Sequence, residues 1–273
     1  PGIAAGGMGG LPGSLALQAD MISKKGAGVL NVNPGKGGIG GEAWARGKQG
    51  PPTAKGGDAT ARGGDASASL QPLRILGISK DMKITMASIF GGDGGKAIAE
   101  PGAGGDGIPC KASAGSGGRG FGQGGAGGGA AYQLTDAIPG TGITRFEEKG
   151  GKGGAAEVQG AKGGFGTHCD ALDGTGGNGG VGGNATAVAG AGGKAKDSTG
   201  ERGIATYPGG NGGDGGDACH PGTRAIGGSG KPDGAIGKDG VKKPELCPKP
   251  QIPEKPPKKI IIETPRTPPP VET

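Results

Sequence analysis

Gly209-Gly-Asn-Gly-Gly-Asp-Gly-Gly-Asp-Ala-Cys219 is the stretch that decides the fold. It contains three unbroken Gly-Gly-X triplets and then a short segment with side chains. Glycine loses more conformational freedom on folding than any other residue. Such a run is therefore either a flexible linker or a place where neighbouring backbones lie too close together for side chains. Its recurrence along the chain favours the second interpretation.

Gly-Gly-X runs, each followed by Ala and another small or β-branched residue, return repeatedly from Lys36 onwards. The Ala after the last triplet of each longer copy marks the repeat. These markers are 33, 26, 29 and 33 residues apart, at Ala97, Ala130, Ala156, Ala185 and Ala218. An irregular repeat of this length indicates a fold made of similar units that stack on one another.

The three-residue period of the sequence matches the three residues per turn of a polyproline-II-type helix. A Gly-Gly-X helix has two faces of bare backbone, which can hydrogen-bond directly to neighbouring helices, and one face that carries X. We therefore predict a bundle or slab of polyglycine-II helices, with few α-helices, some β-strands, long loops and an extended proline-rich tail. The predicted helix-packing positions are Gly91, Gly92, Gly94, Gly95, Gly176, Gly177, Gly179, Gly180, Gly182, Gly183, Gly209, Gly210, Gly212, Gly213, Gly215 and Gly216.

Two other glycine-rich folds fit less well. Collagen needs long unbroken Gly-X-Y stretches rich in proline, which these short runs are not. The calcium-binding nonapeptide roll needs Asp and a large apolar residue at fixed positions, where this chain has Lys96 or Val181 and Gly216. The Gly-Gly-X runs, residues 176–184 and 209–217 above all, instead resemble glycine-rich proteins that fold as polyglycine-II bundles. These are phage tail-fibre-tip adhesins and springtail antifreeze proteins, and the resemblance covers about residues 36–230.

The composition divides the chain into three parts. Residues 1–35 are mixed, with a helix or strand over 14–22 and a further short apolar segment at 29–32. Residues 36–240 form the repeat domain, with a β-rich insert at about 69–90. Residues 241–273 form a tail rich in proline and lysine. Within the tail we expect a subunit contact through one short strand, made of Lys259, Ile260, Ile261, Ile262 and Glu263.

Four cysteines, Cys110, Cys169, Cys219 and Cys247, show no CxxC spacing, and only two histidines accompany them. An even number of cysteines in a chain that is only 31% hydrophobic indicates two disulfides, with three pairings open. Disulfides imply an oxidising compartment. A glycosylation sequon at Asn184 agrees with an extracellular or cell-surface location. The start at Pro1 suggests a mature form after leader removal, or a fragment, and no apolar run reaches the roughly 20 residues of a membrane span.

Catalytic, metal and cofactor sites are not expected. His168-Cys169-Asp170 are consecutive, whereas a catalytic triad is assembled from distant parts of a chain, so a disulfide is favoured for Cys169. The Gly-Gly-Lys segments at 150–152 and 192–194 lack the remainder of a phosphate loop. The net charge of +6 is compatible with anionic partners. The segments at 62–64 and 117–122 resemble Arg-Gly-Gly motifs but are too few for nucleic-acid binding, and Arg119 and Phe121 are better read as X-face residues.

The function predicted from these features is structural: a subunit of an extracellular filament or surface fibre that binds other copies of itself. Backbone hydrogen bonds between helices and contacts through the tail would hold the filament together. One alternative is an adhesin that recognises a receptor, cell surface or polysaccharide. Ice binding is favoured less, because it needs a flat uncharged face and the X positions carry Asp, Lys, Glu and Arg in mixed order.

Overall fold

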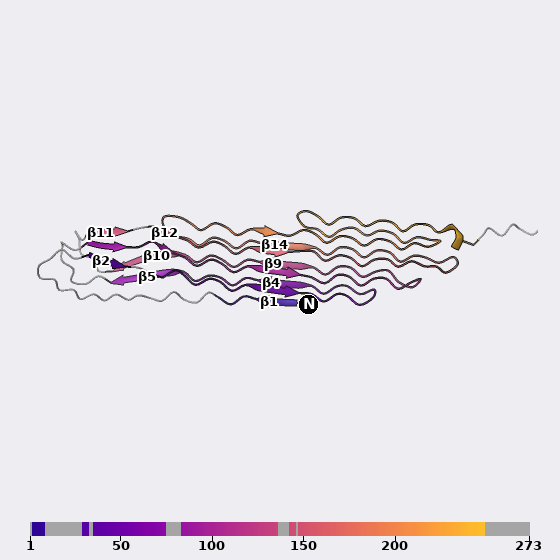
Figure 1. Ribbon diagram of the computed structural model, residues 1–273, viewed down its shortest axis with the longest axis horizontal. Coiled ribbons are helices and arrows are strands. Elements are labelled where there is room, and N and C mark those ends of the chain that lie inside the picture. Colours follow the sequence, from indigo (N-terminus) through magenta and orange to yellow (C-terminus); the bar gives the residue numbers. More distant parts are fainter. Residues whose placement is uncertain are drawn as a thin grey trace, which may run out of the picture.

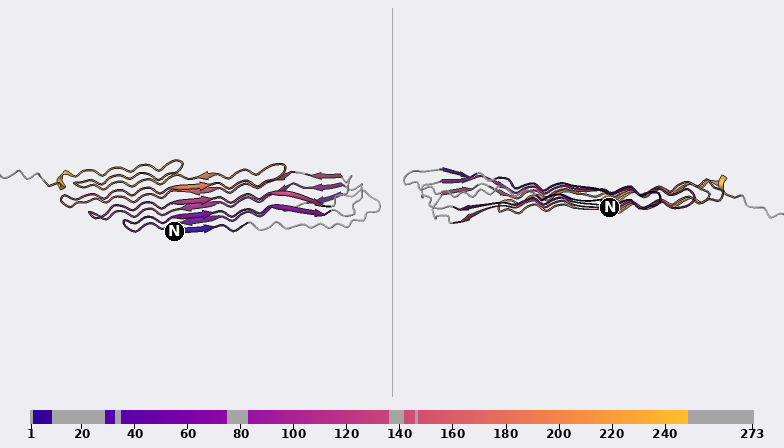
Figure 2. Two further views of the ribbon diagram at one scale, coloured as in Figure 1. Left: turned by 180° about the vertical axis from the view of Figure 1, so that it is seen from behind. Right: turned by 90° about the horizontal axis from the view of Figure 1, so that it is seen from below.

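The computed structural model describes residues 2–8, 29–32, 35–74, 83–135, 142–145 and 147–248. The chain passes back and forth along a long slab, in nearly straight runs that lie side by side (Figure 1). Seen from below, the slab is thin (Figure 2, right). The backbone hydrogen bonds divide the runs into two layers.

In the described part of the chain each layer contains five runs. Layer one consists of residues 2–8, 56–69, 114–130, 176–195 and 220–230. Layer two consists of residues 35–53, 89–107, 150–169, 198–218 and 231–242. Along the Gly-Gly-X triplets each run donates N–H groups to the carbonyls of the following run in its own layer. At the strands a bond also runs the other way, as from the Gln159 N–H to the Ala99 carbonyl at 3.3 Å.

Neighbouring runs in one layer are parallel, whereas runs in opposite layers are antiparallel. Gly209 donates to the Pro232 carbonyl of the next run in its own layer, at 2.9 Å. The following residue, Gly210, donates across the layers to Gly183 at 2.9 Å, and Gly213 donates to Gly180 at 2.8 Å. The first glycine of a triplet therefore joins runs within a layer, and the second joins the two layers.

Both glycines of a triplet are required sterically. A Cβ on Gly212 would lie 2.1 Å from the Ala225 oxygen, and a Cβ on Gly213 would lie 1.9 Å from the Gly164 oxygen. Every predicted helix-packing glycine would bring a Cβ within 3.1 Å of a neighbouring backbone atom, Gly177 being the least crowded of them. The prediction of a polyglycine-II bundle is confirmed.

Midway along the slab the three-residue period changes to short parallel strands. In layer one the sheet order is β1-β4-β9-β14, and in layer two it is β15-β13-β8-β3. The first four strands are Gly2–Ala5, Ala59–Arg62, Gly120–Gln123 and Ala185–Val188, and the second four are Ala205–Thr206, Ala156–Val158, Ala97–Glu100 and Ala43–Arg46.

This band of strands contains a hydrophobic core made almost entirely of alanine. Alternate side chains point inward, and the buried cluster comprises Ala43, Ala45, Ala59, Ala61, Ala97, Ala99, Val158 and Ala185. A methyl group on every second residue suits a strand, in which successive side chains alternate between the two faces. Val158 fits because Gly120 and Gly122 lie opposite, where an added Cβ would be 2.5 Å from its methyl groups. The core is thin because the layers are held together mainly by backbone bonds.

Further parallel strands lie at the end of the slab shown at the left of Figure 1. They form the pairs β10-β5 and β12-β7 and the three-stranded sheet β11-β6-β2. Their bounds are Ala130–Thr135 (β10) with Ser69–Arg74 (β5), Glu148–Lys149 (β12) with Ile89–Phe90 (β7), and Gly142–Arg145 (β11) with Lys83–Met86 (β6) and Val29–Val32 (β2). Strands β5, β6 and β7 lie in the region 69–90, where the sequence predicts a β-rich insert. The segment 14–22 lies outside the described residues.

Asp and Asn at X positions satisfy the third N–H of many triplets. The Asp214 carboxylate accepts the N–H of Lys238 at 2.7 Å, and the carbonyl of Lys238 accepts the N–H of Gly215 at 2.8 Å. We call this reciprocal contact an Asx bridge. The others join Asp58 to Arg119, Asp65 to Ala126, Asp93 to Lys152, Asp106 to Phe165, Asn178 to Thr223, Asn184 to Ser229, Asn211 to Ala235 and Asp217 to Val241.

The slab extends beyond the limits of the predicted repeat domain at both ends. Residues 2–8 form the first run of layer one, and Val241 accepts the N–H of Ala218 at 3.2 Å. A 3-10 helix, Pro244–Leu246, follows the last run. It is the one helix among the described residues, and it is too short to cross a membrane.

Candidate functional site

The two long edges of the slab differ. The last edge, made of runs 220–230 and 231–242, carries side chains where inner runs have glycine. Asp233, Ile236 and Asp239 occupy the first position of their triplets, which Gly209, Gly212 and Gly215 occupy in the preceding run. A Cβ at those three glycines would collide with run 220–230. The last run tolerates side chains because no described run lies beyond it.

The side chains of the last edge also occupy backbone donors. The Asp239 carboxylate accepts the N–H of Arg224 at 2.9 Å, and the Asp233 carboxylate accepts that of Gly230 at 2.9 Å. The X positions of run 231–242 hold Pro232, Ala235, Lys238 and Val241, none of which can form an Asx bridge to a further run. This edge is therefore closed by its own side chains.

The first edge, made of runs 2–8 and 35–53, is open within the described residues. A Cβ on Gly7 would meet no atom within 4 Å. Lys48 occupies the place in its run that Gly102 occupies in the next run. Gly102 must be glycine, because a Cβ there would lie 1.9 Å from the Lys48 oxygen. Lys48 can carry a side chain because no described run lies on its other side. Ile39 and Glu42 are aligned with Asp93 and Lys96 of the next run. The carbonyls of Asp93 and Lys96 accept the N–H groups of Gly40 and Ala43. In the described part of the chain no N–H reaches these two first-edge carbonyls.

Large apolar side chains are exposed on or beside this edge. Ile3, Met8 and Ile39 are exposed, and Trp44, the one tryptophan of the chain, is 60% exposed. The Arg46 guanidinium lies 5.1 Å from the centre of the Trp44 ring. Its Nη2 also pairs with Glu100 on the next strand, at 2.9 Å. Exposed apolar groups with a polar rim are typical of an interaction surface.

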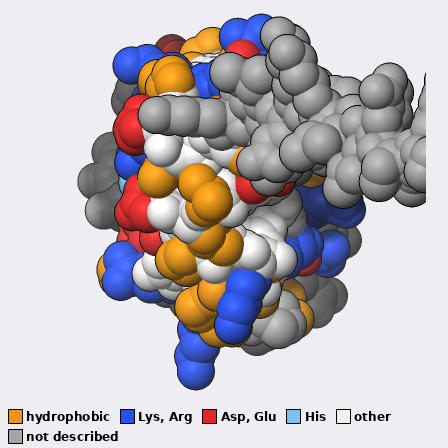
Figure 3. All heavy atoms as spheres, turned by 90° about the vertical axis from the view of Figure 1, so that its right-hand side faces the viewer, with side chains coloured by type: hydrophobic (Ala, Val, Ile, Leu, Met, Phe, Trp, Pro, Cys, Tyr) orange, Lys and Arg blue, Asp and Glu red, His pale blue; other side chains and the backbone are white. Residues whose placement is uncertain are grey.

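Two disulfides cross-link the end of the slab that lies opposite to the strands β2, β5, β6, β10 and β11. The disulfides join Cys110 to Cys169 and Cys219 to Cys247, each with a Cα–Cα distance of 4.9 Å. The structure thus selects one of the three pairings that the sequence leaves open. Viewed end-on, charged side chains lie mostly around the rim of this end, with apolar side chains and backbone between them (Figure 3). The second disulfide ties the chain to the slab just before residues 249–273.

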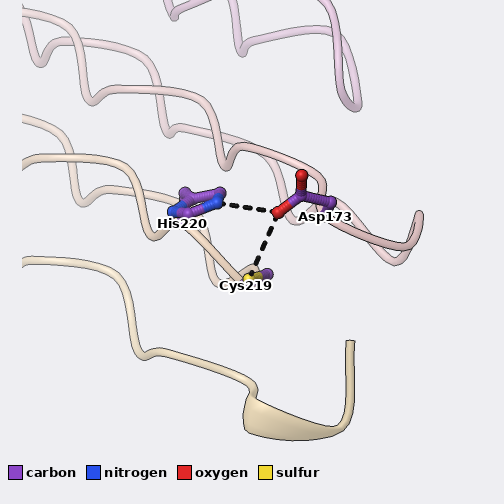
Figure 4. Close-up of side chains that lie close together, drawn as sticks. All are labelled: Asp173, Cys219 and His220. Atoms are coloured by element: carbon purple, nitrogen blue, oxygen red, sulfur yellow. Dashed lines mark hydrogen bonds and ion pairs between the residues drawn. The ribbon is translucent and has the colours of Figure 1, made fainter. Parts of the chain in front are cut away.

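Asp173, Cys219 and His220 lie close together at this end (Figure 4). His220 Nε2 is 2.9 Å from the Asp173 carboxylate, and Cys219 Sγ is 3.9 Å from it. Because Cys219 is bonded to Cys247, its sulfur cannot become a thiolate ligand. The cluster therefore offers a metal ion only two ligand groups, both exposed, and carries no argument for a metal site.

The consecutive residues His168, Cys169 and Asp170 have different partners. His168 Nδ1 accepts the N–H of Asp217 at 2.9 Å, and Cys169 is buried in its disulfide. The hydrogen bond from the Lys243 ammonium, at 2.9 Å, holds the pKa of Asp170 below its usual value. In this arrangement no thiol is available to a histidine base.

Ion pairs between neighbouring runs cover the outer face of layer two. They join Lys36 to Asp93, Arg46 to Glu100, Lys96 to Glu157 and Lys152 to Glu201. A shallow hollow of about 340 Å³ on this face is lined by Ile98, Glu100, Glu157, Gln159, Thr206 and others. Both of its carboxylates, Glu100 and Glu157, are engaged in these ion pairs.

The other predicted residues are distributed along the slab. Asn184 is exposed on layer one, and its Oδ1 accepts the N–H of Ser229 at 3.0 Å. Arg119 is exposed and Phe121 is half-buried on the same layer. The segment Lys259, Ile260, Ile261, Ile262 and Glu263 lies outside the described residues.

Two features were missed from the sequence although it contains signals for them. The Asx bridges have Asp or Asn at the X position directly before the next triplet or strand, as at Asp214. The closed edge is marked by the loss of the first glycine, in Pro232-Asp-Gly-Ala-Ile-Gly-Lys-Asp-Gly240. Side chains at that position indicate a run with no neighbour to crowd it.

Comparison with known proteins gives a likeness at the level of the pattern. No family model matches the chain, and no curated protein does. Among solved structures, the chain is similar to the nine-helix polyproline type II bundle of an antifreeze protein from the springtail Granisotoma rainieri. The two share 22% identity over 72% of this chain and 94% of that chain, with a TM-score of 0.18.

Proposed function

We propose that this protein is a structural subunit of an extracellular filament or surface fibre, and that its C-terminal segment joins one copy to the next. The observation that carries the proposal is the difference between the two edges. The first edge is open within the described residues, whereas at the last edge Asp233, Ile236 and Asp239 occupy the places of the first glycines. Exposed apolar side chains occur at both edges, as at Ile39 and Ile236. A chain with one open edge and one closed edge cannot extend by simple edge-to-edge contact of its slabs.

The C-terminal segment provides the second half of a contact between copies. Residues 249–273 follow in the sequence shortly after the Cys219–Cys247 disulfide, which fixes the last described residues at the cross-linked end of the slab. A contact between one surface on a subunit and a different surface on the next is heterologous, and such contacts build open filaments when the rotation between subunits does not close a ring. A covalent anchor at the base of the segment suits a contact that bears load along the filament.

The remaining features agree with an extracellular structural role. Disulfides persist in oxidising compartments. The backbone-bonded slab needs little apolar surface, and the carboxylates of its shallow hollow are held in ion pairs. We propose no enzymatic activity for the chain.

The antifreeze activity named for the springtail protein suggests a second function to compare. The outer face of layer two carries cross-run ion pairs, and that of layer one carries Arg62, Asp65 and Arg119. Ice binding by a flat uncharged face fits these surfaces less well than the structural role does. No observation on the described residues favours the adhesin over the filament.

Electron microscopy of the full chain and of a variant ending at Pro248 tests the proposal. The truncation begins after Pro248 because Val241 and Lys243 are hydrogen-bonded to Ala218. We expect the full chain to form regular filaments and the truncated chain to remain monomeric with the same circular dichroism spectrum. Filaments of the truncated chain, or a full chain that stays monomeric at every concentration, would refute the proposal.

A further inference from the structure

We infer that residues 259–263 of one copy add as a parallel strand to β3 (Ala43–Arg46) of the next copy, at the first edge of layer two. Residues on either side continue along the same edge as a polyproline-II run. The inference rests on the proposed function and names its docking site. It follows from the order of the segment, its hydrogen-bond donors, its side chains and its reach.

The C-terminal segment has the same order of parts as a run of the slab. In run 89–107 two Gly-Gly-X triplets precede strand β8, and a second stretch with a three-residue period follows it. In the C-terminal segment, prolines at 250, 253 and 256 precede Lys-Ile-Ile-Ile-Glu at 259–263, and prolines at 265 and 268 follow. Proline every third residue suits a polyproline-II helix, and the apolar β-branched centre suits a strand.

Most of the positions at which the segment would donate keep an N–H. Because each run donates along its triplets to the following run in its layer, an added run before residues 35–53 must donate N–H groups to the first-edge carbonyls. Proline cannot donate. The residues of run 35–53 that donate to the next run before and after β3 are Gly37, Gly40, Ala43, Gly47, Gly50 and Thr53. In the register described next their places are taken by Glu254, Pro257, Ile260, Thr264, Thr267 and Pro270, so four of the six keep an N–H.

The side chains are complementary in one register. Strand β3 is paired with β8 so that Glu42, Trp44 and Arg46 align with Lys96, Ile98 and Glu100. The proposed register places Glu263 beside Arg46, on the side of Arg46 opposite to Glu100. Lys259 then lies beside Glu42, and Ile261 lies beside Trp44. Opposite charges and apolar groups paired across neighbouring strands are favourable.

This register also extends patterns already present on the face. Arg46 is paired with Glu100 on its inner side, so Glu263 would give it a second carboxylate on its outer side. Glu42 is exposed and pairs with no cation among the described residues. Ile261 would cover part of the exposed Trp44 ring.

The geometry requires a second copy. Strand β3 runs toward the cross-linked end, parallel to run 198–218, and the last described residues, up to Pro248, lie at that same end. The residues from 248 to 259 span about 34 Å as a polyproline-II helix. To pair in parallel with β3 of its own copy, the segment would have to run from the cross-linked end back along the slab, pass the band of strands and then reverse its direction. The twelve residues from 205 to 217 alone correspond to about 37 Å, so this path is too long.

Trp44 provides a direct test because it is the only tryptophan. We expect the emission of the full chain to shift to shorter wavelength as filaments form. Ile261→Asp should abolish that shift and raise the concentration needed for assembly at least tenfold, whereas Val271→Asp, outside the strand, should change neither. Glu42→Lys and Lys259→Glu should each weaken assembly severalfold, and their combination should restore it.

The outcomes separate the docking site from the function. If filaments form normally with Ile261→Asp and with both single charge reversals, the docking site is wrong although the filament proposal stands. If the single reversals weaken assembly but the double reversal does not restore it, the register is overturned. If no variant and no wild-type sample assembles, both the function and the site are refuted.

Discussion

Replacing Gly213 by alanine should destabilise the slab far more than replacing Gly7 by alanine. Both glycines have backbone angles outside the positive-φ region, so the comparison isolates the space around the added methyl group. At Gly213 the Cβ would lie 1.9 Å from the Gly164 oxygen and 3.1 Å from the Gly180 nitrogen, whereas at Gly7 it would meet nothing within 4 Å. Ordinary contact begins at 3.4 Å, so run 209–217 would have to move away from run 150–169.

The cost follows from the hydrogen bonds that such a movement breaks. Two bonds join these runs beside Gly213: the Gly163 N–H donates to the Asn211 carbonyl at 2.9 Å, and the Gly166 N–H donates to the Asp214 carbonyl at 2.8 Å. Each buried group left without a partner costs about 1–3 kcal/mol, so the two bonds together give a loss of about 2–6 kcal/mol. Gly7→Ala should be neutral or stabilise by up to about 1 kcal/mol, because alanine restricts the unfolded chain.

Urea denaturation followed by circular dichroism, with the disulfides intact, measures the difference. Asp214→Ala serves as an intermediate control, since it removes only the hydrogen bond to Lys238 and should cost about 1 kcal/mol. The expected order of destabilisation is Gly213→Ala, then Asp214→Ala, then Gly7→Ala. If Gly213→Ala were no more destabilising than Gly7→Ala, close backbone packing could not be the reason for the glycines.

Two further predictions concern charge and cross-linking. The N–H of Lys152 and, after it, the Lys36 ammonium hold the pKa of Asp93 below its usual value. The stability that this carboxylate contributes is therefore present above its unfolded pKa of about 3.9, and it is lost as the pH falls further. Asp93→Asn keeps an acceptor oxygen but does not titrate, so between about pH 6 and pH 3 its melting temperature should fall less than that of the wild type; an equal fall would contradict the assignment. Replacing Cys219 and Cys247 together by serine opens a loop of 28 residues and should lower the free energy of unfolding, measured in urea, by about 3–4 kcal/mol. An unchanged free energy of unfolding would contradict this prediction.

The sequence by itself determined the kind of secondary structure and the glycines on which it depends. The period of Gly-Gly-X equals that of the polyproline-II helix, so residues such as Gly212 and Gly213 are identified by their place in the triplet. The number of cysteines likewise indicated two disulfides. These conclusions need only local periodicity and composition.

The tertiary structure decided which distant segments are neighbours. The pairing of Cys110 with Cys169, the bridge from Asp214 to Lys238 and the alignment of β3 with β8 each join residues that no local pattern relates. The two layers and the unlike edges arise in the same way, because a glycine is required only where another run lies against it. Polyglycine-II helices bond through identical backbone groups, so any run could pair with any other until the loops, the Asx bridges and the disulfides select one arrangement.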